Sequence, residues 1–175
     1  GVDKRIIFLE DQDYAVFLHF LKLCLSPPPP SNPTKIMSFS YKNLSGQVDL
    51  LSFVLMPNHF HLFIRQKIPD GIEVLMRSII TRYVKYFNHK YQRQGHLFQG
   101  RYKAIRIDNE PYFLHLSRFI HLNPLEIWSN TLETYPYSSY PYYLGKKKAH
   151  WLNTQTLLSY FSVHQKGIFS QIESY

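Results

Sequence analysis

The sequence predicts an α+β fold in which helices pack on one face of an antiparallel sheet. Two observations favour this class. Short segments alternate apolar and polar residues as strands do, and separate longer segments carry apolar residues at helical spacing. The chain has 175 residues, of which 45% are hydrophobic, so it can bury a core. No clear linker divides it, and we expect one domain over residues 1–130 with a C-terminal extension over 131–175 packed on it.

The first half of the chain is expected to begin with a helix over residues 11–25. A run of four prolines follows at 27–30 and predicts a stiff polyproline loop. Three strands are then expected, with turn residues between the first two, at residues 36–41, 48–55 and 60–65. A long helix over residues 71–91 follows the third strand.

The second half is expected to open with a basic, aromatic loop over residues 95–108 that runs into a short strand. Asn109 can cap the next helix, which ends near Asn123 because a proline follows. Residues 135–140 are predicted to be irregular and aromatic. A short helix is expected near residues 154–161.

The charge balance favours an anionic partner. Lys and Arg number 20 against 12 Asp and Glu, which gives a formal net charge of +8. Nucleic acid is the first choice for such a partner, although a basic protein need not bind nucleic acid. The single cysteine, Cys24, excludes an internal disulfide framework, and no apolar run reaches membrane-spanning length. We therefore expect a cytoplasmic protein.

A pair of histidines gives the strongest local signal. Residues 56–62 read Met-Pro-Asn-His-Phe-His-Leu. Alternate residues of a strand face the same side, so His59 and His61 should point together while Phe60 points the other way. Two imidazoles on one face can chelate a divalent metal ion. A hydrogen-bonded or surface pair is the alternative interpretation.

A further metal ligand could come from the end of the helix that Asn109 caps. Asn123 offers a carbonyl oxygen there, and oxygen with imidazole suits magnesium or manganese. Phe119 lies one helical turn earlier and would approach an ion held by Asn123. The alternatives are plain: asparagine before proline commonly ends a helix, and phenylalanine commonly packs in a core.

A third feature is the segment over residues 95–104, in which glycines, cations and aromatic residues alternate. Such a segment can let a nucleic-acid backbone approach closely, pair with phosphates and stack on bases, or it can be a solvated loop. With two cations of the preceding helix, the candidate DNA-binding residues are Arg82, Lys85, His96, Gln99, Arg101, Tyr102 and Lys103.

Four motifs occur in one order along the chain. They are Met-Pro-Asn-His-Phe-His-Leu at 56–62, Gly-His-Leu-Phe-Gln-Gly-Arg-Tyr-Lys-Ala at 95–104, Arg-Phe-Ile-His-Leu-Asn-Pro at 118–124 and Tyr-Pro-Tyr-Ser-Ser-Tyr at 135–140. This series resembles the REP-associated branch of the single-tyrosine HUH transposases. The resemblance covers nearly the whole chain, and the ordered set is specific although each motif is modest alone.

The resemblance implies a ferredoxin-like core with the histidine pair on a central strand. It implies that His59, His61 and Asn123 bind a divalent metal ion, Mg²⁺ or Mn²⁺. The implied substrate is single-stranded or hairpin DNA, typically a REP palindrome, which the family cuts through a 5′-phosphotyrosine intermediate. The resemblance also implies a bacterial cytoplasmic protein. A monomer is expected, since the REP-associated branch is more often monomeric, and a dimer is the alternative because the simplest single-tyrosine relatives work as dimers with shared sites.

The sequence departs from this family at two places. Phe119 stands where the family has its tyrosine nucleophile, and phenylalanine has no hydroxyl to form a phosphotyrosine. Engineering and natural divergence both explain the change, and the intact ligand residues favour engineering. The family's first strand would precede Gly1, so the sequence is expected to begin after it and to leave a sheet edge uncovered.

Other functions stay open on the sequence alone. A domesticated protein could bind DNA without cutting it, and stacking aromatics with cations could equally serve RNA. A metallohydrolase that activates water could also employ two histidines and would need no tyrosine.

Overall fold

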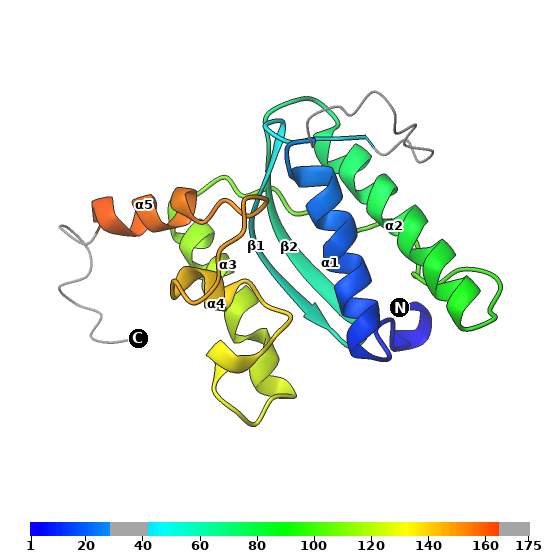
Figure 1. The fold of residues 1–175 in the computed structure, drawn as a ribbon. Coiled ribbons are helices and arrows are strands. Elements are labelled where there is room, and N and C mark those ends of the chain that lie inside the picture. The colour runs from blue at the N-terminus through cyan, green and yellow to red at the C-terminus, as the bar shows by residue number, and fades with distance from the viewer. Residues whose placement is uncertain (29–41, 165–175) are drawn as a thin grey trace.

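The described residues form a two-stranded antiparallel sheet with helices on both of its faces, as the computed structural model in Figure 1 shows. The structure describes residues 1–28 and 42–164. The main elements are α1 (Asp11–Leu25), β1 (Val48–Met56), β2 (His59–Gln66), α2 (Gly71–Lys90), α3 (Glu110–Leu122), α4 (Tyr140–Tyr143) and α5 (Gln155–His164). Three 3₁₀ helices complete the set, η1 (Val2–Lys4), η2 (Asn123–Glu126) and η3 (Leu132–Thr134).

The two strands pair from Val48 opposite Gln66 to Met56 opposite His59. The register shifts between Leu50 and Ser52, so one extra residue of β1 lies within the ladder. A bulge of this kind turns the residues beyond it to the other face. Leu50 and Phe53 therefore share one core although they are three residues apart.

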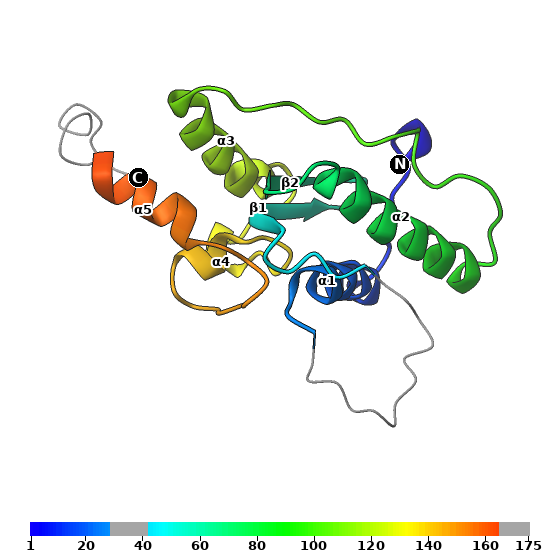
Figure 2. The ribbon, with the colours of Figure 1, turned by 90° about the horizontal axis from the view of Figure 1, so that it is seen from above.

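Helices α1 and α2 cover one face of the sheet. Their apolar stripes meet that face in a core that includes Phe17, Leu75, Tyr83 and Phe87, all fully buried. Figure 2 shows both helices on the same side of the strands. The period-3.6 spacing of these residues is what makes each helix bury a single stripe.

Helix α3 covers the opposite face, where it contacts both strands. Ile120 anchors it in a second core with residues of β1 and β2, and Tyr135 and Leu157 join the same core from the C-terminal region. The predicted α+β class is confirmed. Helices α1 and α2 pack on one face as expected, and α3 adds a layer on the other.

The outer edge of β1 is covered by C-terminal residues. The backbone of Leu55 donates to Tyr137, Ser139 donates to Phe53, and Asn153 donates to Leu50, at 2.8–2.9 Å. Among the described residues, no segment pairs with the outer edge of β2.

Most predicted elements are confirmed within one or a few residues. These are the helices over 11–25, 71–91, 109–123 and 154–161 and the strands over 48–55 and 60–65. The strand over 36–41 and most of the polyproline loop lie outside the described residues. No described helix is long and apolar enough to cross a membrane.

The predicted short strand before Asp108 is wrong. Residues 101–107 run from the loop to the start of α3 without strand structure, and most of their side chains are exposed. Figure 2 shows this long irregular connection. No described strand lies alongside it, and an extended segment becomes a strand only when its backbone groups pair with a neighbour.

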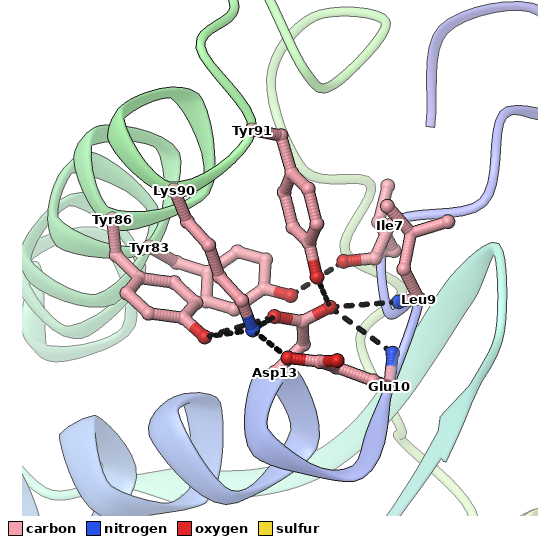
Figure 3. A network of polar contacts seen from close by, with 8 residues as sticks. All are labelled: Ile7, Leu9, Glu10, Asp13, Tyr83, Tyr86, Lys90 and Tyr91. Carbon is pink, nitrogen blue, oxygen red and sulfur yellow. Dashed lines mark hydrogen bonds and ion pairs between the residues drawn. The ribbon is translucent and has the colours of Figure 1, made fainter.

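A buried carboxylate joins the start of α1 to the end of α2. The Asp13 side chain is 0% exposed, and it accepts hydrogen bonds from the backbone of Leu9 and Glu10 and from Tyr86, Tyr91 and Lys90, at 2.8–3.2 Å. Figure 3 shows these donors converging on the two carboxylate oxygens. Five donors satisfy a charge that would otherwise be costly to bury.

Candidate functional site

The two histidines lie together on the face of β2 that α3 covers. The centroids of the His59 and His61 rings are 5.0 Å apart, with the rings nearly perpendicular. Phe60 points to the other face, where its ring lies 4.9 Å from that of Phe17 and 6.0 Å from that of Phe98. The predicted alternation of side chains between the two faces of this strand is therefore confirmed. Phe60, between the histidines, packs against α1 through Phe17.

The end of α3 brings two further predicted residues to the pair. The Phe119 ring lies 5.4 Å from the His61 ring, edge to face. Asn123, the first residue of η2, has its side chain close enough to His59 to raise the pKa of that ring, against the larger opposite effect of burial. The sequence offered helix termination and core packing as alternatives for these residues. Phe119 is 53% exposed, which excludes a core role for its side chain.

Local sequence explains why α3 ends where it does. Asn109 accepts a hydrogen bond from the backbone of Tyr112 at 3.0 Å and so caps the first turn. Ile120, 1% exposed, fixes the last turns against the sheet. The α-helix ends at Leu122, and the chain continues as η2, which begins with Asn123 and Pro124. The Asn109 cap, the buried Ile120 and the proline after Asn123 together place positions 119 and 123 beside β2.

A comparison with protein families matches this chain over residues 23–123 to the family described as Transposase IS200 like. That match covers more than half of the sequence. The chain belongs to the IS200-like transposase family. No curated protein and no solved structure matched it. The match includes both histidines and ends at Asn123, and it gives the chain a transposase role, within a class of DNA-cleaving enzymes.

Both histidines of this IS200-like transposase are favoured in their neutral form. Burial lowers the pKa of His59, an effect that Asn123 and the charge of Glu126 only partly offset. Burial also lowers the pKa of His61, and the neighbouring His59 adds to this. Neutral imidazoles keep a nitrogen lone pair available, which metal coordination requires.

Asn58, which the sequence analysis did not single out, orients the first histidine. Its Oδ1 lies 2.6 Å from Nδ1 of His59, so Nδ1 donates and Nε2 keeps the lone pair. Histidines that bind metal ions usually donate their other ring nitrogen to an oxygen in this way. The place of Asn58 in the turn directly before the pair was the available sequence signal.

The donor set of the IS200-like transposase fits a divalent ion with open coordination positions. Two imidazoles and one amide oxygen can gather there, and the exposed Glu126 lies close enough to influence the His59 pKa. Among the described residues, no three or more His, Cys, Asp or Glu side chains cluster as metal ligands. The Asn123 oxygen is therefore the third donor that these residues offer. The metal-binding role of these residues stays a prediction.

The candidate DNA-binding residues do not all lie in one place. His96, Gln99, Arg101, Tyr102 and Lys103 are exposed on the long connection between α2 and α3. Lys85 is exposed on α2. Arg82 is partly buried on α2. Burial raises the pKa of the Cys24 thiol on α1, and the nearby charge of Arg82 offsets a part of this rise. Arg82 therefore lies toward the helix layer opposite the histidine pair, and the structure does not bring it to that site.

Proposed function

We propose that this transposase acts on single-stranded DNA that folds into hairpins of the REP palindrome type, and that the chain with Phe119 binds such DNA without cutting it. The observation that supports the proposal is the position of Phe119, exposed and against His61, beside Asn123. A tyrosine at this position would hold its hydroxyl next to the candidate ligands. The proposal places the protein in the REP-associated branch of its family.

His59, His61 and Asn123 would hold the divalent ion, Mg²⁺ or Mn²⁺. When bound, such an ion polarises a scissile phosphate and neutralises its developing charge. The chain's own contribution is orientation: Asn58 fixes the His59 ring, and burial holds both imidazoles neutral. All of these residues belong to one chain, which favours a monomer as the working form.

The covalent step needs a hydroxyl at position 119. In the family's reaction the tyrosine oxygen attacks the scissile phosphorus and loses its proton. The bond from phosphorus to the 3′ oxygen breaks, leaving a free 3′-hydroxyl and a 5′-phosphotyrosine. Phenylalanine has no oxygen at this place, so the unmodified chain should retain DNA and leave it intact.

The test restores that oxygen. Phe119→Tyr protein is incubated with Mn²⁺ and a labelled pool of DNA hairpins whose stems and flanking bases are randomised, and covalent adducts are separated on a denaturing gel. We expect an adduct with Phe119→Tyr and none with the unmodified chain. The double variant Phe119→Tyr/His61→Ala is the matched control and should form none. An adduct in that control, or its absence from Phe119→Tyr, would contradict the assignment.

A second candidate function is non-catalytic nucleic-acid binding by a domesticated protein, and Phe119 is the observation that favours it. Such a protein would bind hairpins equally well with either residue at position 119 and would cut with neither. Competition between DNA and RNA hairpins of the same sequence separates the two polymers, since contacts to the 2′-hydroxyl distinguish RNA. Cutting by the unmodified chain would instead support a metallohydrolase.

A further inference from the structure

We propose that His121 and Ser139 form a positioning pair that fixes the rotation of α3 on the sheet, and so sets where Asn123 and side chain 119 lie relative to the histidines of β2. The inference rests on the proposed function for the role of those residues. It gives a purpose to the motif at 135–140, which the candidate site does not use.

The hydroxyl of Ser139 lies between the backbone of β1 and the ring of His121. Its Oγ accepts the backbone N–H of Phe53 at 2.9 Å and donates to the Phe53 carbonyl at 3.1 Å. A hydroxyl has one hydrogen and two acceptor sites, so this oxygen can take part in a further hydrogen bond. His121 Nε2 lies 2.8 Å from this oxygen and forms a hydrogen bond with it, whose direction follows from the tautomer of the ring. The contact joins α3 to the backbone of β1 through one buried atom.

The anchor on β1 lies close to the histidine pair. Phe53 faces Leu62 across the sheet, and the next residue, Val54, faces His61. Any shift of α3 along or around its axis would therefore change its distance to His61 and its distance to the Ser139 anchor together. The positioning pair contacts Phe53, and the candidate site includes His61, which pairs with the next residue of β1, Val54.

Helical geometry directs the candidate site residues and His121 to opposite sides of α3. Successive residues are rotated by about 100° around a helix axis. With Ile120 pointing into the sheet, positions 119 and 123 point to one side and His121 points to the other. Phe119 and Asn123 accordingly reach the β2 histidines, while His121 reaches Ser139 at the outer edge of β1. The helix is held on both flanks.

Aromatic rings enclose the imidazole. The centroid of the His121 ring lies 5.4 Å from that of Tyr140 and 5.0 Å from that of Tyr143. Tyr143 donates in turn to the carbonyl of Leu51 on β1. The enclosure leaves the ring little freedom to turn away from Ser139, which is the condition for a positioning contact rather than an incidental one.

The test measures position and ion binding separately. The ring protons of Phe119 and His61 should show a nuclear Overhauser contact in the full chain, and Mn²⁺ binding can be followed by the loss of the free-ion electron paramagnetic resonance signal. His121→Ala and Ser139→Ala should lose the ring contact and weaken Mn²⁺ binding about tenfold, because Asn123 moves with α3, and groups that orient metal ligands typically change affinity by this much. The side-chain amide of His121→Gln can donate to or accept from the Ser139 hydroxyl, so this variant should restore both.

Ser117→Ala is the matched control, because Ser117 is also a buried serine, and its hydroxyl donates within α3 to the carbonyl of Leu114. It should leave both measurements unchanged. Folded Ser139→Ala protein that keeps the ring contact and full Mn²⁺ affinity would overturn the inference, as would folded His121→Gln protein that fails to restore them. If His121→Ala does not fold, the measurements on Ser139→Ala and His121→Gln test the inference. If the unmodified chain shows the ring contact but binds no Mn²⁺, the proposed metal site is wrong. The positioning role of His121 and Ser139 is then judged from the ring contact of the variants.

Discussion

At the scale of single residues, Asp13 shows how one buried charge depends on its partners. Burial alone would raise its pKa, but hydrogen bonds from Lys90, Tyr91, Tyr86 and the Leu9 backbone outweigh this and hold the pKa below its ordinary value. A depressed folded-state pKa stabilises the native state above the unfolded-state pKa, near 3.9. That stabilisation is lost as the pH falls through the folded-state value.

Replacing this carboxylate should lower stability and change its dependence on pH. We expect Asp13→Asn to reduce the free energy of unfolding at neutral pH by about 3 kcal/mol, because Lys90 loses its buried partner. The variant should also lose less stability than the unmodified chain below about pH 4. Urea unfolding at several pH values measures both effects.

Glu73→Gln provides the control for this prediction. It makes the same chemical change at an exposed carboxylate, which is paired with Arg77 one helical turn away. Exposed pairs of this kind contribute little, so its effect should stay below about 0.5 kcal/mol. Equal losses in the two variants would show that the Asp13 network is not a stabilising feature.

At the scale of elements, α3 has to end and begin at defined residues for the candidate site to form. Asn109→Ala removes the side chain that caps its first turn and should cost about 1 kcal/mol. Asn109→Asp keeps an acceptor at this position and should cost less. Amide hydrogen exchange should show faster opening of the first turn in Asn109→Ala, while the last turn, held by Ile120, keeps its protection. Uniform loss of protection along α3 would contradict separate anchoring of its two ends.

Sequence patterns predicted those elements whose signal is local. The apolar spacing of α1 and α2, the alternation of β2 and the Asn109 cap each act within a few residues, and each was predicted. The same alternation and the spacing from 119 to 123 predicted the residues that gather at the site.

Other features depend on contacts between distant segments. Tyr137 and Ser139 cover the edge of β1, more than 80 residues from their partners. The five donors of Asp13 come from both the start of α1 and the end of α2. No local pattern encodes such pairs. The short strand expected at the end of the loop over residues 95–108 did not form, because a strand needs a neighbouring strand that local sequence does not supply.

At the scale of the whole molecule, the sheet separates two layers. Helices α1 and α2 lie on one side, and α3 with the histidine pair lies on the other, with the connection over 101–107 leading to α3 (Figure 2). A nucleic acid that reaches the histidines has to approach from the α3 side. Arg101 and Lys103 are exposed on the segment that leads there, whereas Arg82 lies toward α1.

This arrangement predicts unequal effects of charge removal on DNA binding. Each phosphate contact to a single strand contributes about 0.7 to the slope of log affinity against log salt concentration. The double variant Arg101→Ala/Lys103→Ala should therefore weaken hairpin binding and flatten that slope by roughly 1.4. The double variant Arg82→Ala/Lys85→Ala should flatten it less, because only Lys85 of that pair is exposed.

The control removes the same charge elsewhere. Lys147 and Lys148 are exposed between α4 and α5, so Lys147→Ala/Lys148→Ala lowers the net charge equally without touching the connection to α3. If long-range attraction alone governed binding, all three double variants would weaken it alike, since that effect depends on total charge. A flattened slope confined to positions 101 and 103 would instead mean that this segment contacts phosphates. An unchanged slope in that variant would remove Arg101 and Lys103 from the proposed DNA interface, because each phosphate contact that is lost lowers the slope.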